Sequence, residues 1–415
     1  MIARKSAHVD SRRAVSVAEP DPPSSPSIVR RGAIGQPAFR GHIRELDGLR
    51  AIAVILVFLN HYAPIDSIPQ FRAIRELGWI GVDIFFVISG LLITGILLDS
   101  PDRGYYRRFY IRRTLRIFPL YYAVIAATIV GMLVVTQGGW QYHQMVEHWG
   151  SPAWLFGYLG NVLTSVRNVS PPDPFVPMWS LHVEEQFYLL FPLLVHRLDH
   201  RSLRRVLLAA IVISPLIRLL LWAAVPDRPL LQYMLLPCRL EGLALGGLIA
   251  LRFRTQPIHI TKTALAGVAT VLSIAAYLVF ALGGGSFDSP LERTVGYTLF
   301  DVAIAGWILW IMLFGGRLTQ WLNARPLQYI GKISFGLYLL QMPIATFLWG
   351  LSLRFGRPIS FQTVGGSLIL AGLCVVFATL SWYLMEQPIL RLKDRWAPSR
   401  APESRELSEL QPEAA

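Results

Sequence analysis

The sequence contains little cysteine and little lysine. Its 415 residues include two cysteines, Cys238 and Cys374, and both lie in apolar segments, so no disulfide framework is indicated. None of the nine histidines belongs to the HExxH pattern of a zinc enzyme, so the sequence indicates no metal site. Basic charge comes almost entirely from arginine, because the only lysines are Lys5, Lys262, Lys332 and Lys393.

Charged residues are also scarce. They make up 16% of the chain, whereas hydrophobic residues make up 53%, and the mean hydropathy is +0.45. These values exclude an ordinary soluble protein and favour one polytopic membrane domain. The formal net charge of +13 is first a topology signal, because Lys and Arg stay on the cytoplasmic side of a membrane. A nucleic-acid partner would need a soluble basic domain, and the sequence shows none.

Ten apolar segments predict an all-α, polytopic transmembrane helix bundle. They cover approximately residues 46–63, 78–98, 116–135, 179–197, 204–225, 236–252, 262–283, 295–315, 329–350 and 362–386. The polar residues 1–44 lack the apolar core of a signal peptide and are predicted to form a disordered basic tail. The membrane domain is therefore predicted over residues 45–395, followed by a second tail at 396–415.

Arginines are concentrated in alternate connections between these segments. The connection 136–178 holds only Arg167, whereas the preceding and following connections are rich in arginine. This alternation predicts ten spans with both tails in the cytoplasm, and only the ninth connection, with Arg354 and Arg357, departs from it. Basic residues predicted at the cytoplasmic side include Arg103, Arg107, Arg108, Arg197, Arg201, Arg204, Arg205, Arg252 and Arg254.

Arg50 and His61 share the first apolar segment, with ten residues between them. Eleven steps of α-helix make about three turns and rise roughly 16 Å, so both side chains lie on one face at different depths. Ionisable groups are costly inside a span, which predicts a functional pair. The structural alternative is an arginine that snorkels at one interface and a histidine near the other.

Two polar clusters are predicted around this face. Arg50, Arg113 and Arg116 lie near the cytoplasmic side, where planar guanidinium groups suit a phosphorylated ligand, or alternatively lipid headgroups. His61 lies in the outer half with Asp83, Glu184 and Glu185. A histidine oriented by a carboxylate suits a general base near neutral pH, whereas the alternative is a set of buried pairs that hold helices together.

Seven stretches together resemble the acyltransferase-3 family of bacterial integral-membrane O-acyltransferases. In chain order they are ELDGLRAIAVILVFLNHY (45–62), GVDIFFVISGLLI (81–93), YYRRFYIRRTLRIFPLYY (105–122), MWSLHVEEQFYLLFPLL (178–194), RLEGLALGGLIA (239–250), YIGKISFGLYLLQMPI (329–344) and SWYLMEQPILR (381–391). The resemblance implies a multi-pass enzyme of the bacterial cytoplasmic (inner) membrane. Its expected reaction moves an acyl group, usually acetyl from acetyl-CoA, onto a hydroxyl of a sugar in a surface or exported glycan. Acyl-CoA is the donor substrate, and no bound cofactor is expected.

The resemblance matches family patterns to Arg50 and His61, to Arg113 and Arg116, and to residues 179–189, and together with the two polar clusters it gives the expected residue roles. The expected catalytic residues are His61, Glu184 and Asp83. The expected acyl-CoA ligands are Arg50, Arg113 and Arg116. The residues expected to bind the acceptor or support the site are Trp179, Ser180, Glu185, Tyr188, Tyr338 and Gln341. Gln341 departs from the family, which usually has a histidine there, so a titrating group is missing at that position.

Several alternatives remain at this stage. The acceptor could be a macrolide or other secondary metabolite, and His61 could act as a base or carry the acyl group itself. A transporter or flippase also fits ten spans, although the paired repeats typical of transporters are not visible. Some relatives carry an extracytoplasmic domain after the membrane part. The sequence ends soon after the tenth segment, so a separate periplasmic partner is expected for any later step.

Overall fold

The computed structural model describes residues 43–100, 104–135 and 140–397, and these residues form helices and no strands. The predicted tails, 1–44 and 396–415, lie almost wholly outside the described residues. The chain divides into the units Met1–Ala38 and Phe39–Ala415, and only the second contains described residues. The all-α prediction is confirmed over the described part of the chain.

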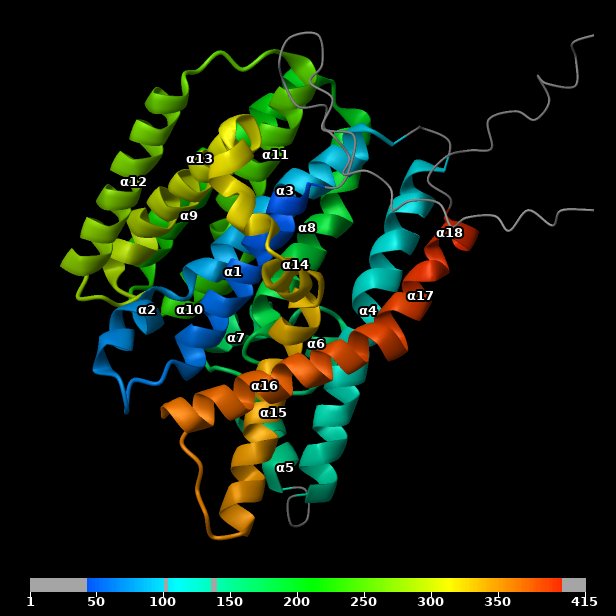
Figure 1. Ribbon diagram of the computed structural model, residues 1–415, viewed down its shortest axis with the longest axis vertical. Helices are drawn as coiled ribbons and strands as arrows, with labels where there is room; N and C mark the ends of the chain where they lie inside the picture. The colour runs from blue at the N-terminus through cyan, green and yellow to red at the C-terminus, as the bar shows by residue number, and fades with distance from the viewer. Residues whose placement is uncertain (1–42, 101–103, 136–139, 398–415) are drawn as a thin grey trace, which may run out of the picture. The chain divides into compact units, whose positions relative to one another are not determined.

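Each of the ten predicted segments overlaps a long helix, although 329–350 is divided between α14 and α15. The long helices are α1 (Arg44–Tyr62), α3 (Ile80–Leu98), α4 (Tyr105–Val135), α8 (Met178–Arg197), α9 (His200–Ala224), α11 (Leu240–Thr255), α12 (Lys262–Leu282), α13 (Tyr297–Phe314), α15 (Ser334–Arg354) and α16 (Val364–Ser381) (Figure 1). The shorter α-helices are α2 (Arg72–Leu77), α5 (Trp140–His148), α6 (Ala153–Phe156), α7 (Gly160–Arg167), α10 (Pro229–Met234), α14 (Arg325–Lys332), α17 (Gln387–Arg391) and α18 (Lys393–Trp396). The other helical turns are η1 (Pro69–Phe71), η3 (Asp173–Phe175), η4 (Leu236–Cys238), η5 (Glu292–Gly296), η6 (Gly316–Asn323) and η7 (Trp382–Glu386).

Seven helical segments of the described chain are long and apolar enough to cross a membrane, which makes this a multi-pass membrane protein. Helices α1, α8 and α11 are outside that set. Helix α11 has only 16 residues, and α1 carries several charged side chains in its first two turns. The count of ten spans and the cytoplasmic position of both tails therefore stay predictions.

One end of the bundle collects the arginine-rich turns. Arg254, at the end of α11, forms an ion pair of 2.5 Å with Asp99, which directly follows α3. The ring of Tyr105, at the start of α4, stacks on His196 near the end of α8, with centroids 4.7 Å apart. We call this the arginine-rich end: α3, α8 and α11 finish there, and α4 and α9 begin there.

The opposite end contains the end of α1 and the start of α8, and we call it the His61 end. His61 and Trp179 line one cavity there. The connection after α1 is held to the start of α16 by a 2.8 Å hydrogen bond from the Ser360 hydroxyl to Asp66. These contacts agree with the predicted relative directions of six helices: α1, α3, α4, α8, α9 and α11.

Helix α3 is the centre of the packing. It contacts α11 most extensively, and it also packs on α1, α8 and α13. Two glycines allow the close approach to α11: a Cβ on Gly90 would lie 1.9 Å from the carbonyl oxygen of Leu243, and one on Gly246 would lie 2.0 Å from that of Val87. Small residues at helix crossings let backbones touch, as is common in membrane bundles.

Candidate active site

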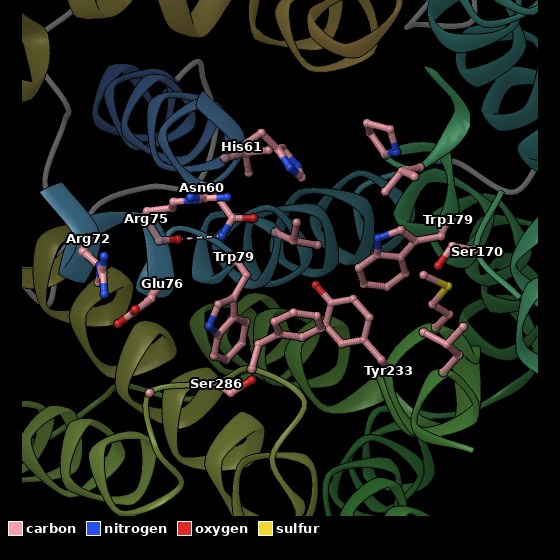
Figure 2. A pocket seen from close by; sticks show the side chains of 18 of the residues that line it. Asn60, His61, Arg72, Arg75, Glu76, Trp79, Ser170, Trp179, Tyr233 and Ser286 are labelled. Atoms are coloured by element: carbon pink, nitrogen blue, oxygen red, sulfur yellow. Dashed lines mark hydrogen bonds between the residues drawn. The ribbon is translucent and has the colours of Figure 1, made fainter. Parts of the chain in front are cut away.

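A cavity of about 730 Å³ opens at the His61 end. Its walls come from the end of α1, from α2, from the starts of α3 and α8, from α10 and from the connection 284–287 (Figure 2). The amide of Asn60 donates a 2.6 Å hydrogen bond to the backbone oxygen of Arg75, which fixes α2 against α1. The short polar helix α2 thereby brings charged side chains to the rim of an otherwise apolar bundle.

His61 points into this cavity (Figure 2). Its ring is only partly buried, and its nitrogens form no hydrogen bond with any described residue. The charged side chain that acts most directly on it is Arg75. The imidazole is therefore free to accept a proton from, or bond to, a molecule that enters the cavity.

Aromatic side chains form one wall of the cavity. The rings of Trp179 and Tyr233 lie 4.6 Å apart, and Trp79 continues the wall through Tyr297, 5.2 Å away. In Figure 2 Trp179 lies at one side of the cavity, and Arg72 and Glu76 of α2 lie at the other. The cavity thus presents both flat apolar rings and charged hydrogen-bonding groups.

The three predicted acyl-CoA ligands meet deeper in the bundle, between α1 and α4. Arg113 and Arg116 lie near Arg50, and each is partly buried. Neither Arg113 nor Arg116 forms a hydrogen bond or ion pair with the described residues, although Arg113 lies 5.4 Å above the ring of Tyr188. Arg50 has one ion pair, at 3.3 Å, with Asp47. Most guanidinium donors of this cluster are therefore available to an anion.

The acidic pair of α8 lies beside these arginines. Glu184 accepts a 2.6 Å hydrogen bond from the Ser89 hydroxyl on α3 and interacts electrostatically with Arg113 and Arg50. Glu185 is next to Arg113, and its Oε1 has no hydrogen-bond partner among the described residues. The prediction that Glu184 and Glu185 lie with His61 is therefore corrected: the structure groups both with the arginine cluster, and neither lines the cavity that contains His61.

The expected grouping of Asp83 with His61 requires correction. Asp83 is fully buried and forms an ion pair with Arg239, at the start of α11. A second buried ion pair, Arg218 with Glu241, lies in the same region, and Asp301 of α13 adds a further buried carboxyl. A buried carboxylate needs a cation beside it, and here the cation is an arginine on a neighbouring helix rather than His61.

Ser180 and Tyr338 join the start of α8 to α15. Their hydroxyls lie 2.6 Å apart, and the Tyr338 hydroxyl also donates to the Pro177 carbonyl at 2.9 Å. Tyr338 reaches the cavity wall as well. Gln341 is buried below it, donates from its amide nitrogen to the Tyr338 carbonyl at 3.3 Å, and leaves its side-chain oxygen without a described partner.

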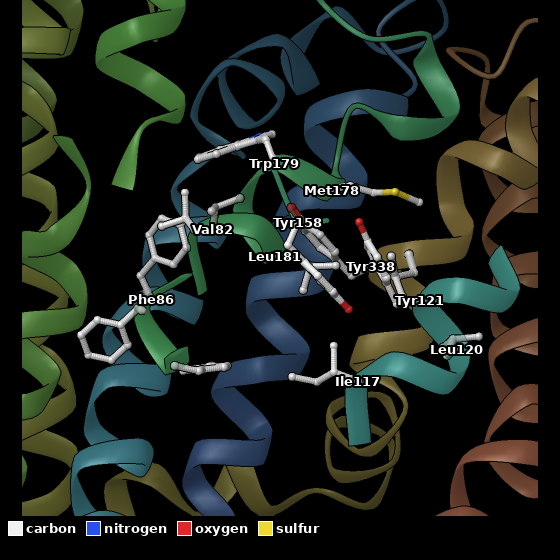
Figure 3. Close-up of a cluster of buried hydrophobic side chains, with 14 of the residues drawn as sticks. Val82, Phe86, Ile117, Leu120, Tyr121, Tyr158, Met178, Trp179, Leu181 and Tyr338 are labelled. Atoms are coloured by element: carbon white, nitrogen blue, oxygen red, sulfur yellow. The ribbon is translucent and has the colours of Figure 1, made fainter. Parts of the chain in front are cut away.

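His182, which lies three residues beyond Trp179, belongs to the packed interior. Its Nδ1 accepts from the backbone N–H of Asn161 at 3.1 Å, so its Nε2 is the atom that donates to the Tyr121 hydroxyl at 2.7 Å. Figure 3 shows Tyr121 and Tyr158 in the surrounding apolar cluster. These bonds satisfy both ring nitrogens, so His182 holds α8 to Asn161 and Tyr121 and is not available to a bound molecule.

Sequence reasoning missed the contribution of α2. Arg72, Arg75 and Glu76 line the cavity, and so does Tyr233 of α10. Arg75 and Glu76 follow Arg72 by three and four residues in a short polar segment. This spacing could have predicted that the three side chains share one face of a helix. Among the described residues, no group of three His, Cys, Asp or Glu side chains could hold a metal ion.

Comparisons with known proteins identify the family. A family model described as an acyltransferase domain matches residues 43–386. The chain is 29% identical over 371 residues to peptidoglycan O-acetyltransferase OatA of Listeria monocytogenes, covering 84% of this chain and 56% of the relative. It is 26% identical over 368 residues to the putative peptidoglycan O-acetyltransferase YrhL of Bacillus subtilis, covering 84% and 55%. It is 29% identical over 375 residues to O-acetyltransferase OatA of Staphylococcus aureus, covering 84% and 57%.

The chain spans little more than half the length of these curated relatives, and no solved structure matches it significantly. The match to the family model includes α1, both arginines of α4, the acidic pair of α8 and the cavity of the His61 end. The chain therefore belongs to the acyltransferase-3 family.

Proposed function

We propose that this protein is an O-acetyltransferase of the bacterial cytoplasmic membrane that transfers acetyl from acetyl-CoA to a hydroxyl of a surface or exported glycan. One observation carries the proposal: Arg50 and His61 lie on one continuous helix, with His61 in an open cavity and Arg50 beside Arg113 and Arg116. The similarity to peptidoglycan O-acetyltransferase OatA and to O-acetyltransferase OatA supports a glycan acceptor.

The donor is proposed to bind with its phosphates at the arginine cluster. Guanidinium groups without ion-pair partners suit phosphate oxygens, and Arg113 and Arg116 supply two of them. The eleven-residue separation of Arg50 and His61 corresponds to a rise of roughly 16 Å along α1. An extended pantetheine arm can cover that distance, so the thioester would reach the floor of the cavity.

The acceptor is proposed to occupy the cavity itself. The C–H faces of a sugar ring pack well on flat aromatic rings, and Trp179 and Tyr233 provide such a surface. Hydroxyl groups of the sugar can bond to Arg75, Glu76 and Asn60 around the rim. The acceptor hydroxyl would then face His61.

The transfer needs one base and no change of oxidation state. His61 takes the proton of the acceptor hydroxyl while the oxygen attacks the thioester carbon, an O–C bond forms and the C–S bond breaks. The proton passes from His61 to the CoA sulfur. In the alternative route the imidazole nitrogen first takes the acetyl group and then passes it to the acceptor. Both routes require a free imidazole in the cavity.

The test uses purified protein in lipid nanodiscs with radiolabelled acetyl-CoA and an acceptor panel of cell-wall glycan fragments and a hydroxylated macrolide. His61→Ala should lower the transfer rate by at least about 100-fold. His143→Ala, which changes an exposed histidine of α5, is the matched control and should retain full activity. A well-folded His61→Ala protein with normal turnover would refute the proposal, and transfer to the macrolide alone would refute the glycan acceptor.

The two sites imply a fixed sidedness, with donor entering at the arginine-rich end and acceptor at the His61 end. A labelling test of this sidedness needs an exposed position in the connection 136–178. Ser165 of that connection is unsuited, because it is buried and its hydroxyl donates to the Leu230 carbonyl. The adjacent Val166 is 56% exposed. Val166→Cys should react with a membrane-impermeant thiol reagent on intact cells, whereas Arg317→Cys, near the start of α1, should react only after permeabilisation. The reverse pattern would invert the proposed topology.

A further inference from the structure

A second cavity, of about 460 Å³, lies at the arginine-rich end between the start of α9 and the end of α11. Four arginines line it: Arg201, Arg204, Arg205 and Arg252. His200, Thr255 and Gln256 complete the polar lining, and no carboxylate belongs to it. This cavity shares no residue with the cavity that contains His61 or with the arginine cluster of α1 and α4.

The arginines of this cavity lack the ion pairs that other arginines of the bundle make. Arg254, only two residues after Arg252, is paired with Asp99, and the buried arginines of α9 and α11 are paired as well. Arg252 donates instead to Gln256 and the Pro257 carbonyl, and none of the four forms an ion pair with a described residue. The nearby carboxylate of Asp199 caps α9 through the Ser202 N–H and attracts Arg205, whose guanidinium donates to the Ser202 hydroxyl at 3.0 Å.

The cavity has apolar lining residues on α11, and an exposed apolar strip runs from Arg205 along α9, a helix long and apolar enough to cross a membrane. The apolar lining residues are Leu248 and Leu251. Three, seven and eleven residues after Arg205 on α9 come Leu208, Val212 and Leu216, which lie on the same helix face and are 45%, 58% and 50% exposed. A ligand with an anionic head and apolar chains would contact both the arginines and the apolar residues, whereas a soluble anion would contact only the arginines.

We propose that this cavity binds the phosphodiester headgroup of an anionic phospholipid, with the acyl chains lying along α9. Topology alone explains arginines at the end of a span. It does not explain a cavity of this size that combines apolar residues with four guanidinium groups that form no ion pair within the described part of the chain. The bound lipid would join α9 to α11 at the end opposite the His61 cavity. Because α11 packs on α3, the lipid would also stabilise the centre of the bundle.

The experiment compares the full chain in nanodiscs of phosphatidylcholine with and without phosphatidylglycerol, measuring bound lipid by native mass spectrometry and the thermal midpoint. Arg201, Arg204, Arg205 and Arg252 are changed together to Gln. Each arginine near a membrane surface contributes roughly fivefold to anionic-lipid binding, so the variant should retain phosphatidylglycerol at least about tenfold less well. The matched control changes four exposed arginines outside the cavity to Gln: Arg107, Arg317, Arg325 and Arg391.

The proposal predicts that phosphatidylglycerol raises the thermal midpoint of the parent and of the control but not of the cavity variant. Equal retention by all three proteins would overturn it, and equal loss in both variants would show a general surface-charge effect instead. Displacement of phosphatidylglycerol by soluble 3′-phosphoadenosine diphosphate would assign the cavity to a nucleotide. If the fourfold variant fails to fold, a photoreactive phosphatidylglycerol should crosslink to α9 and α11 in the parent, and crosslinking elsewhere alone would refute the site.

Discussion

The crossing of α3 and α11 offers the sharpest test of how this bundle is held together. Changing Gly90 to Ala adds one methyl group, and that carbon would lie 1.9 Å from the Leu243 carbonyl oxygen. An ordinary carbon–oxygen contact is about 3.3 Å or more, so the two backbones would have to separate by more than about 1 Å. The contact atom belongs to the backbone of α11, so no side chain can rotate away to relieve the clash.

The expected cost follows from overpacking. Inserting a methyl group into a closely packed interior costs about 1–3 kcal/mol. Alanine is a better helix former than glycine by up to about 1 kcal/mol, and this gain reduces the net loss only partly. We therefore expect the thermal midpoint of Gly90→Ala to fall by several degrees, roughly 2–8 °C. Gly246→Ala should behave similarly, because its added carbon would lie 2.0 Å from the Val87 carbonyl oxygen.

Gly267 of α12 provides the matched control. No atom lies within 4 Å of the position that its Cβ would take, so Gly267→Ala gains helix propensity without a clash. Its thermal midpoint should be unchanged or slightly raised when purified proteins are heated in the same nanodiscs. Equal midpoints for Gly90→Ala and Gly267→Ala would refute the inference that α3 and α11 are in backbone contact.

Three further substitutions separate the donor site from the buried ion network. Arg113→Ala and Arg116→Ala should each weaken acetyl-CoA binding about ten- to a hundredfold, because charge-assisted contacts to phosphate contribute roughly 1.5–3 kcal/mol. Titration of the purified variants with CoA would measure this, and unchanged affinity would place the donor elsewhere. Asp83→Asn should lower the thermal midpoint sharply, because loss of one partner from a buried ion pair costs about 3–5 kcal/mol and leaves Arg239 without its ion-pair partner. A variant with a normal midpoint but no activity would return Asp83 to a catalytic role.

The helices themselves could be predicted from hydropathy, but their limits could not. The third segment was predicted from residue 116, whereas α4 begins at Tyr105 and includes Arg113 in the same helix. The segment 329–350 is divided in the structure, because α14 ends at Lys332 before α15 begins. Hydropathy follows the part of a helix that is apolar, and it does not detect a polar extension that is stabilised by neighbouring helices.

The pairing of charges could not be predicted for a different reason. The sequence placed His61 and Arg50 on one helix face, which depends only on local spacing, and α1 has that geometry. The partner of Asp83 is 156 residues away, and no local pattern connects them. A carboxylate near the start of one helix can meet any of several helices, and only the packing of α3 on α11 selects Arg239.

The three long helices that fall outside the apolar set also explain how ionisable groups are tolerated in this bundle. Helices α1 and α8 carry His61, Arg50 and the acidic pair, and α11 begins beside the buried ion pairs. Neighbouring helices meet their polar groups, because Ser89 of α3 bonds to Glu184 of α8 and Asp83 of α3 pairs with Arg239 at the start of α11. The apolar window of Pro69–Leu98, which includes α3, is 67% buried, against 17% in His200–Ala224. Lipid-facing helices such as α9 provide the membrane surface, and the less apolar helices are free to carry polar chemistry. The candidate site is therefore built partly on α1 and α8, which lie outside the apolar set, and partly on the polar first half of α4, which supplies Arg113 and Arg116.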